Sequence, residues 1–297
     1  MQWVLHIGIP KTGSKAIQHF LASQANCIAG ARLCFPAQGR VGVWHDPLFR
    51  SLWENDGRDL DAALSANDPQ EWDIGVFSCE GFHYLKPRSV RMIFEKLGAA
   101  QIVLFMRQQD DVMNSLLNQH AKAHRVCFDE IAEFERNLTN YDPNFDYQAI
   151  ISKWADVFGK KAITPVIYDK RTDSVRVFCD AIGVQIPATY EPMANPNPAL
   201  TRSAYDAFLS AKASVSELSK LPALVKRLRA DFADQMVDTF REAGPLLFDD
   251  RVRREILRNY ESSNEWVRAQ WFPSRSTLFE IPARETHYVH RHSSLPL

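Results

Sequence analysis

The sequence lacks long apolar segments and paired cysteines. No run approaches the ~18 uninterrupted apolar residues that a membrane-spanning helix needs, and the first apolar run starts too early to leave room for a secretory signal. The five cysteines are scattered and form no C-x-x-C pair, which disfavours a disulfide framework. We therefore expect a soluble, cytoplasmic protein with free thiols.

Charge of either sign is not in excess. The chain has 35 Lys and Arg against 36 Asp and Glu, which gives a formal net charge of −1. A surface that binds polyanions generally needs a basic excess, so the composition argues against nucleic acid as a partner. The 297 residues, 45% of them hydrophobic, are enough to bury a large core.

The strongest local pattern lies close to the N-terminus. Residues 3–7 form an apolar run typical of a buried strand, and residues 8–14 are rich in glycine, proline and small polar side chains. Apolar residues then recur at helical spacing over residues 16–21. A loop between a strand and a helix directs backbone N–H groups and the positive end of the helix dipole toward one point, so this segment predicts a phosphate or sulfate site.

The loop sequence G-I-P-K-T-G-S, from Gly8 to Ser14, resembles the 5′-phosphosulfate loop of sulfotransferases that use 3′-phosphoadenosine 5′-phosphosulfate (PAPS), whose usual form is G-x-P-K-T-G-T/S-T. The ATP-type P-loop requires Lys followed by Ser or Thr after its second glycine, whereas this chain has Ser14 followed by Lys15. The resemblance implies that the 5′-phosphosulfate contacts Pro10, Lys11, Thr12, Gly13, Ser14, Lys15 and Ala16. Lys15 departs from the usual hydroxyl residue, so an ammonium would replace a hydroxyl there.

A second predicted strand, residues 73–80, ends in a carboxylate. Ligands of an open parallel α/β sheet lie beyond the carboxyl ends of the strands, so Glu80 is expected at the same edge as Lys11 and is the candidate general base. The stretch from Ser78 to Phe82 resembles the S-S-E-x-[FL] segment of bacterial carbohydrate sulfotransferases, which implies a carbohydrate-type hydroxyl acceptor. His83 and His45 are the alternative bases, and a capping or ion-paired Glu80 is the structural alternative.

A third predicted strand, residues 101–107, ends in Arg107, and a helix is expected from Asp110 to Ala123. The spacing from Arg107 to Ser115 resembles the sulfotransferase motif R-D-P-x-x-x-x-x-S at its two 3′-phosphate-binding positions, although Gln108-Gln109 replace Asp-Pro. A guanidinium can hold phosphate through two N–H bonds, and a hydroxyl can add a third. The resemblance therefore implies that these two residues bind the 3′-phosphate.

The remaining pattern continues the alternation of helices and strands. Residues 162–169 are predicted to form a fourth strand, which Pro165 confines to an edge, with Tyr168 either near the nucleotide or in the core. The order F-D-Y, W-x-x-x-F-G and a strand with Tyr also resembles bacterial sulfotransferases. After a proline-rich segment the chain is predicted to be mostly helical, over residues 201–218, 221–243 and 250–271.

These patterns predict a P-loop-like α/β fold in three layers, with a central parallel sheet flanked by helices. A PAPS-binding core is expected over residues 1–186, with a helical part, 187–297, packed on it. His287, His290 and His292 are predicted to belong to a tail rather than to a metal site.

The resemblance implies transfer of a sulfuryl group from PAPS to a hydroxyl of a carbohydrate or glycolipid, with 3′-phosphoadenosine 5′-phosphate (PAP) as product and no metal. Lys11 would neutralise the bridging oxygen, and Glu80 would accept the proton. Two other classes stay open: a P-loop nucleotide or small-molecule kinase, and a non-catalytic PAP-binding homologue. The oligomeric state is not indicated by the sequence.

Overall fold

The computed structural model describes residues 1–24, 28, 30–192, 198–215, 217–237 and 247–279. The chain forms two compact units whose segments alternate along the sequence. The first unit comprises residues 1–112, 142–196 and 260–278, and the second comprises residues 113–141, 197–259 and 279–297. The division into a core over residues 1–186 and a helical part over 187–297 stays a prediction. The C-terminal histidines named above lie outside the described residues.

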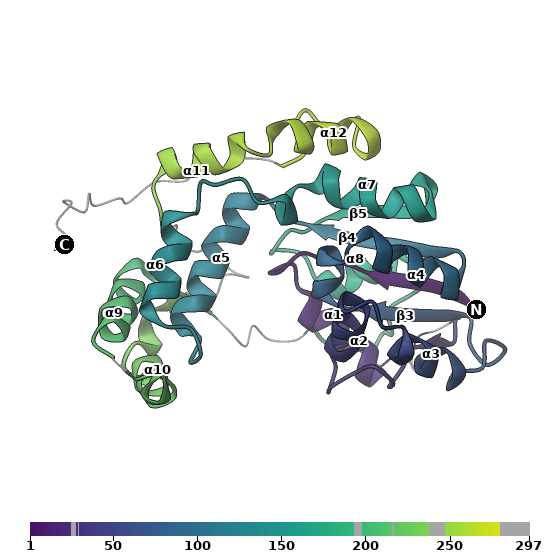
Figure 1. Ribbon diagram of the computed structural model, residues 1–297, viewed down its shortest axis with the longest axis horizontal. Coiled ribbons are helices and arrows are strands. Elements are labelled where there is room, and N and C mark those ends of the chain that lie inside the picture. The colour runs from purple at the N-terminus through teal and green to yellow at the C-terminus, as the bar shows by residue number, and fades with distance from the viewer. Residues whose placement is uncertain (25–27, 29, 193–197, 216, 238–246, 280–297) are drawn as a thin grey trace. The chain divides into compact units, whose positions relative to one another are not determined.

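A five-stranded parallel sheet organises the first unit (Figure 1). The strand order is β2-β3-β1-β4-β5, and the strands are β1 (Gln2–His6), β2 (Leu33–Cys34), β3 (Ile74–Ser78), β4 (Ala100–Met106) and β5 (Ile163–Ile167). The chain leaves β1 toward one edge of the sheet and later returns to its other side for β4. The topological switch point therefore lies at β1, where open α/β sheets bind their ligands. This arrangement confirms the predicted α/β fold with a parallel central sheet.

Helices cover the sheet because each parallel connection needs a crossover. Right-handed crossovers running in opposite directions place their helices on opposite faces. On one face α1 (Ser14–Gln24) packs against α8 (Ser174–Ala181), and apolar side chains of both helices join a buried cluster with Val4, Val103 and Phe105 of the strands. On the other, α7 (Tyr147–Phe158) packs against β4 and β5, and α4 (Pro87–Leu97) and α12 (Glu261–Trp271) pack against α7.

One detail of the first unit differs from the sequence analysis, and another agrees with it. The strand predicted to reach Glu80 ends at Ser78, and Glu80 instead begins the short 3-10 helix η2 (Glu80–Tyr84) after extended backbone at Cys79. Pro165 lies in β5 at the edge of the sheet, as predicted, because an edge strand can lack one N–H donor. The loop after β2 leads into α2 (Asp46–Trp53) and α3 (Arg58–Ser65).

The second unit is mainly helical. Its helices are α6 (Phe128–Arg136), α9 (Arg202–Ala213), α10 (Leu221–Asp231) and α11 (Asp250–Arg258), and α5 (Gln109–Lys122) contributes to both units. The helices predicted over 201–218 and 221–243 were too long. Helix α9 ends at Ala213, and α10 ends at Asp231, before the short strand β7 (Met236–Val237), which pairs antiparallel with β6 (Ala199–Leu200). The helix predicted over 250–271 is two helices, α11 and α12, with a break after Arg258.

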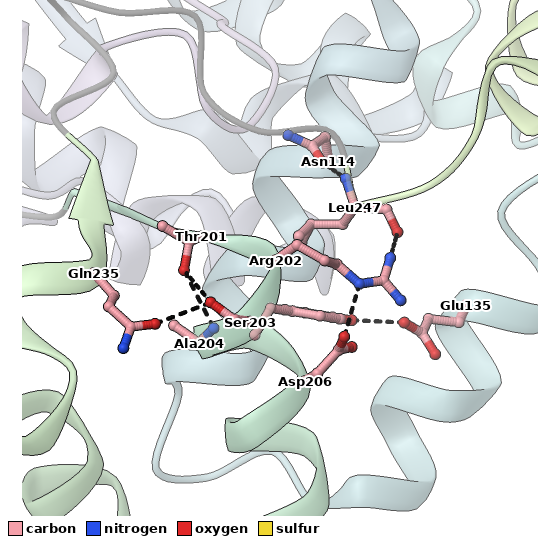
Figure 2. Close-up of polar contacts among 10 residues, drawn as sticks. Asn114, Glu135, Thr201, Arg202, Ser203, Ala204, Asp206, Gln235 and Leu247 are labelled. Carbon is pink, nitrogen blue, oxygen red and sulfur yellow. Dashed lines mark hydrogen bonds and ion pairs between the residues drawn. The ribbon is translucent and has the colours of Figure 1, made fainter. Parts of the chain in front are cut away.

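Polar side chains tie the second unit together. Figure 2 shows Arg202 between two acceptors, the Asp206 carboxylate at 3.0 Å and the backbone oxygen of Leu247. The Asn114 side chain accepts the N–H of Leu247 at 2.8 Å. The buried Lys212 ammonium donates to three backbone oxygens at the end of α5 and in the loop after it, those of His120, Ala123 and Val126, at 3.0, 2.7 and 2.7 Å. These bonds supply a donor to carbonyl groups at and just after the end of α5, where intrahelical donors run out.

Candidate functional site

The loop from Gly8 to Ser14 connects the end of β1 with the start of α1. Lys11 and Gly13 have φ angles of 70° and 81°, while Pro10 and Thr12 beside them lie outside the positive-φ region. Such alternation turns successive N–H groups toward one side. The N–H groups of residues 12–15 find no acceptor among the described residues. They are therefore available to an anion at the N-terminus of α1.

Gly13 is required by both conformation and space. A methyl group at this position would lie 2.6 Å from the Ser174 hydroxyl oxygen and 3.3 Å from a ring carbon of Tyr168, in addition to the strain of the positive φ. Ser174 begins α8 and Tyr168 follows β5. The loop is therefore held in place by two elements far along the chain.

Lys11 lies among charged neighbours. Burial lowers the pKa of its ammonium, Glu80 raises it, and Arg107 and Lys15 lower it further. These residues come from the loop, η2, the end of β4 and α1, so the carboxyl edge of the sheet gathers three cations around one carboxylate. An excess of positive charge beside free N–H groups favours a bound anion.

Arg107 is fixed at the end of β4 from several sides. Its guanidinium donates to the backbone oxygen of Lys11 at 2.8 Å and lies 5.5 Å from the centroid of the Tyr168 ring. The Tyr147 hydroxyl accepts the Arg107 N–H at 2.9 Å and also donates to the Arg107 backbone oxygen. Only part of the guanidinium is used by these contacts, so N–H groups are left for a ligand.

Glu80 keeps some exposed surface, although protein surrounds it on most sides. Burial raises the pKa of its carboxyl group, while Lys11 and the Ser14 hydroxyl act to lower it. The Ser14 hydroxyl is near enough to stabilise the carboxylate, yet it forms no hydrogen bond of ordinary geometry with any described residue. A carboxylate with a raised pKa beside a lysine has the properties of a general base.

The two alternative bases are both buried. His45 Nε2 donates to the Pro36 backbone oxygen at 3.1 Å, and its Nδ1 accepts the N–H of Ser78 at 3.3 Å, so no lone pair is left for a substrate proton. Burial lowers the pKa of His45 to about 4. Burial likewise lowers the pKa of His83 to about 4, and its Nδ1 bonds the Glu80 backbone oxygen. Its Nε2 is buried without a partner among the described residues.

The remaining residues that were predicted to bind the nucleotide differ in their surroundings. The Thr12 hydroxyl donates to the Ile9 oxygen at 2.7 Å, and the Ala16 N–H donates to the Gly13 oxygen at 3.0 Å, so both groups serve the loop itself. Lys15 is exposed, with its ammonium 6.0 Å from the centroid of the Trp44 ring. Ser115 lies in the part of α5 that belongs to the second unit, and its role at a 3′-phosphate stays a prediction.

Several residues that shape the site were not assigned by sequence. Tyr147 was noticed only within the F-D-Y pattern, and its contact with Arg107 spans 40 residues, so no local signal reveals it. Ser174 follows the helix-capping Asp173, which marks a helix start but not its contact with Gly13. The indole of Trp44 stands exposed in the loop before α2.

Neither a metal cluster nor a membrane span is found in the described part of the chain. Among those residues, no three or more His, Cys, Asp or Glu side chains gather closely enough to hold a metal ion. None of the described helices combines the length and apolarity needed to cross a bilayer.

Two solved structures show a likeness to the chain. A sulfotransferase from Alicyclobacillus acidocaldarius is 18% identical, with 76% of this chain and 96% of that chain covered and a TM-score of 0.41. The mouse sulfotransferase SULT7A1 in complex with PAP is 12% identical, with 92% of this chain and 80% of that chain covered and a TM-score of 0.37. No protein-family model and no curated protein matches the chain. Because these identities and TM-scores are low, the functional argument rests on the residues of this chain.

Proposed function

We propose that the protein is a sulfotransferase that moves a sulfuryl group from PAPS to a hydroxyl acceptor. The observation that carries the proposal is the free N–H groups of residues 12–15 beside Lys11, with Arg107 and Glu80 at the same sheet edge. PAPS supplies the transferable sulfuryl group and a nucleotide leaving group. The loop sequence, with Lys11 inside the loop and Ser14 before Lys15, fits the phosphosulfate loop better than an ATP loop.

Each charged residue has a separate task in this proposal. Backbone N–H groups hold the 5′-phosphosulfate, and Lys11 stabilises the negative charge that grows on the leaving phosphate oxygen. Arg107 binds the 3′-phosphate with its free N–H groups. Glu80 takes the proton of the acceptor hydroxyl, which becomes more acidic as its oxygen bonds to sulfur.

Glu80 is favoured over the histidines by its surroundings. It is the group of the three that keeps exposed surface, and it is coupled electrostatically to Lys11. His45 has both ring nitrogens engaged, and His83 is 1% exposed. A base needs an accessible lone pair within reach of the substrate proton, which the carboxylate provides.

The acceptor is proposed to be a carbohydrate-type alcohol. The support is the segment from Ser78 to Phe82, together with Trp44, a residue that is 43% exposed and whose ring lies close to the Lys15 ammonium. An exposed aromatic ring offers an apolar surface on which the C–H face of a sugar can pack.

Two measurements test the function. Thermal unfolding with PAP, with ATP and with ATP plus Mg²⁺ identifies the nucleotide, and the proposal expects stabilisation by PAP without metal. Transfer of labelled sulfate from PAPS to a panel of sugars and simple alcohols then measures turnover. Stabilisation by ATP and Mg²⁺ alone would indicate a kinase, and PAP binding without transfer to any acceptor would indicate a non-catalytic homologue.

A further inference from the structure

His6, the last residue of β1, is a buried polar side chain that the proposed mechanism does not use. Its ring is 0% exposed and lies between Phe105 and Phe178, with centroid distances of 5.1 and 5.4 Å. Its Nδ1 is 2.7 Å from the Ser78 hydroxyl of the neighbouring strand β3, where the parallel register pairs the two residues. Its Nε2 has no hydrogen-bond partner among the described residues.

The free Nε2 of His6 lies under the anion-binding loop. A methyl group built on Gly8 would lie 3.2 Å from this nitrogen, 3.1 Å from the Ser14 hydroxyl oxygen and 2.9 Å from the Thr12 hydroxyl oxygen. Three polar atoms therefore converge on the side of Gly8 where any other residue would carry a side chain. Thr12 already donates to Ile9, whereas Ser14, 1% exposed, also has no partner in the described part of the chain.

Counting hydrogen bonds identifies the tautomer of His6. Burial lowers the pKa of its ring to about 3, so the imidazole is neutral and carries one proton. If the Ser78 hydroxyl donates to Nδ1, the ring proton is on Nε2, on the side of Gly8 where the Ser14 oxygen also lies. With the opposite tautomer the Ser14 hydroxyl could donate to Nε2, but the Ser78 proton would have no acceptor among the described residues, so the first tautomer leaves fewer groups unmet.

We propose that His6 is a positioning residue of the anion-binding loop. Its Nε2–H donates to the Ser14 hydroxyl, directly or through one buried water. This bond directs the Ser14 proton toward Glu80 or the bound 5′-phosphate. The hydrogen bonds then run in one direction, from Ser78 to His6, from His6 to Ser14, and from Ser14 to the anion. Because the bond from His6 orders the Ser14 hydroxyl, this neutral donor does not have to reorient when the ligand binds. This role rests on the proposed function of the loop.

The test compares two variants and two nucleotides. His6→Leu removes both ring nitrogens, and His6→Gln keeps an amide donor close to the place of Nε2. PAP carries a 5′-phosphate, whereas adenosine 3′-phosphate does not, so only PAP reports on the loop. Calorimetry should show His6→Leu binding PAP roughly 3–10-fold more weakly, with adenosine 3′-phosphate unchanged and His6→Gln within about twofold of wild type.

Nitrogen NMR of labelled histidines supplies a readout that a merely structural role would not move. The proton should be on Nε2 of His6 in the free protein, and its resonance should shift with PAP but not with adenosine 3′-phosphate. A proton on Nδ1, equal weakening of both nucleotides by His6→Leu, or unchanged PAP binding by that variant would overturn the role of His6. Failure of the wild-type protein to bind PAP would instead overturn the proposed function, and this role with it.

Discussion

Two sets of buried polar groups, one in each unit, differ in how their hydrogen bonds are met. In the second unit the buried Lys212 ammonium donates to three backbone oxygens, and the Tyr205 hydroxyl donates to Glu135 at 2.8 Å. In the first unit Ser14 and His6 are also buried, yet each leaves an atom without a partner among the described residues. An unmet buried group costs free energy, and at the loop of residues 8–14 the proposed bond from His6 to Ser14, together with a bound anion that accepts from Ser14, would remove that cost.

This difference separates residues whose loss should affect turnover from residues whose loss should affect stability. Substitutions at the loop of the first unit should change ligand binding or rate with a small cost in folding. Substitutions at satisfied groups of the second unit should do the reverse. The predictions below test that separation, beginning with the largest effect.

Replacing the proposed base should have the largest effect. Glu80→Gln keeps the shape of the side chain but removes its basicity, so kcat should fall by roughly 10²–10⁴-fold while PAP affinity persists. Because burial raises the pKa of Glu80, the wild-type rate should also fall as pH drops through a value above the usual range of a glutamate. Rate measurements across pH check both points. Near-normal kcat in Glu80→Gln, together with a loss in His83→Ala or His45→Ala, would assign the base to a histidine.

Removing the loop lysine should act mainly on the rate. Lys11→Ala should lower kcat by about 10²–10³-fold and weaken PAP far less, because the interaction strengthens as charge develops on the leaving oxygen. Lys161→Ala, at an exposed lysine of the same unit, is the matched control. A variant with normal kcat and a raised KM for PAPS would mean that Lys11 only anchors the nucleotide.

Arg107 should act on affinity rather than on the chemical step. Arg107→Ala removes a charge-assisted contact and should weaken PAP by about 10-fold or more, whereas adenosine 5′-phosphosulfate, which lacks the 3′-phosphate, should bind nearly as before. Calorimetry with both ligands measures the difference. Equal weakening of the two ligands would show that the substitution disturbs the loop through the bond from Arg107 to the Lys11 backbone oxygen.

In the second unit the matching experiment should affect stability alone. Lys212→Met keeps most of the aliphatic stem but leaves the backbone oxygens of Ala123 and Val126 without their donor and removes one of the two donors to His120, so the free energy of unfolding should fall by about 1–3 kcal/mol. PAP affinity should not change. Lys220→Met, at an exposed lysine of the same unit, is the control and should cost little. A loss of PAP affinity in Lys212→Met would contradict the separation between the units.

The sequence predicted what depends on local pattern. Continuous apolar runs identified the long buried strands, and the rule for parallel sheets correctly gathered Lys11, Glu80 and Arg107 at one edge. Their chemical roles stay predictions. The end of α10 could not be predicted, because β7, which follows it, pairs with β6, a segment far away in the chain.

The surroundings of the site residues escaped prediction for the same reason. Ser78 bonds His6 because β1 and β3 are in register, a contact across 72 residues. His45 lies in the loop before α2 and is nevertheless buried, where it bonds Pro36 and Ser78 on separate segments. Sequence motifs identify the charged residues that lie at the edge of the sheet, whereas the positions of the groups that orient these residues depend on tertiary packing.

The smallest effect concerns the neutral buried histidines of the first unit. Burial lowers the pKa of His45 from an ordinary value of 6.5 to about 4, so between these values the unfolded chain binds a proton that the folded protein does not. Stability should therefore fall as pH drops below 6.5, and His45 alone should account for about 2 kcal/mol over the two pH units below 7. Urea unfolding across this range should give a shallower pH dependence for His45→Gln than for the wild-type protein, even though the variant loses two hydrogen bonds and is less stable at neutral pH. Equal slopes would mean that His45 becomes charged without unfolding, and its ring would then be open to solvent and again a candidate for the base.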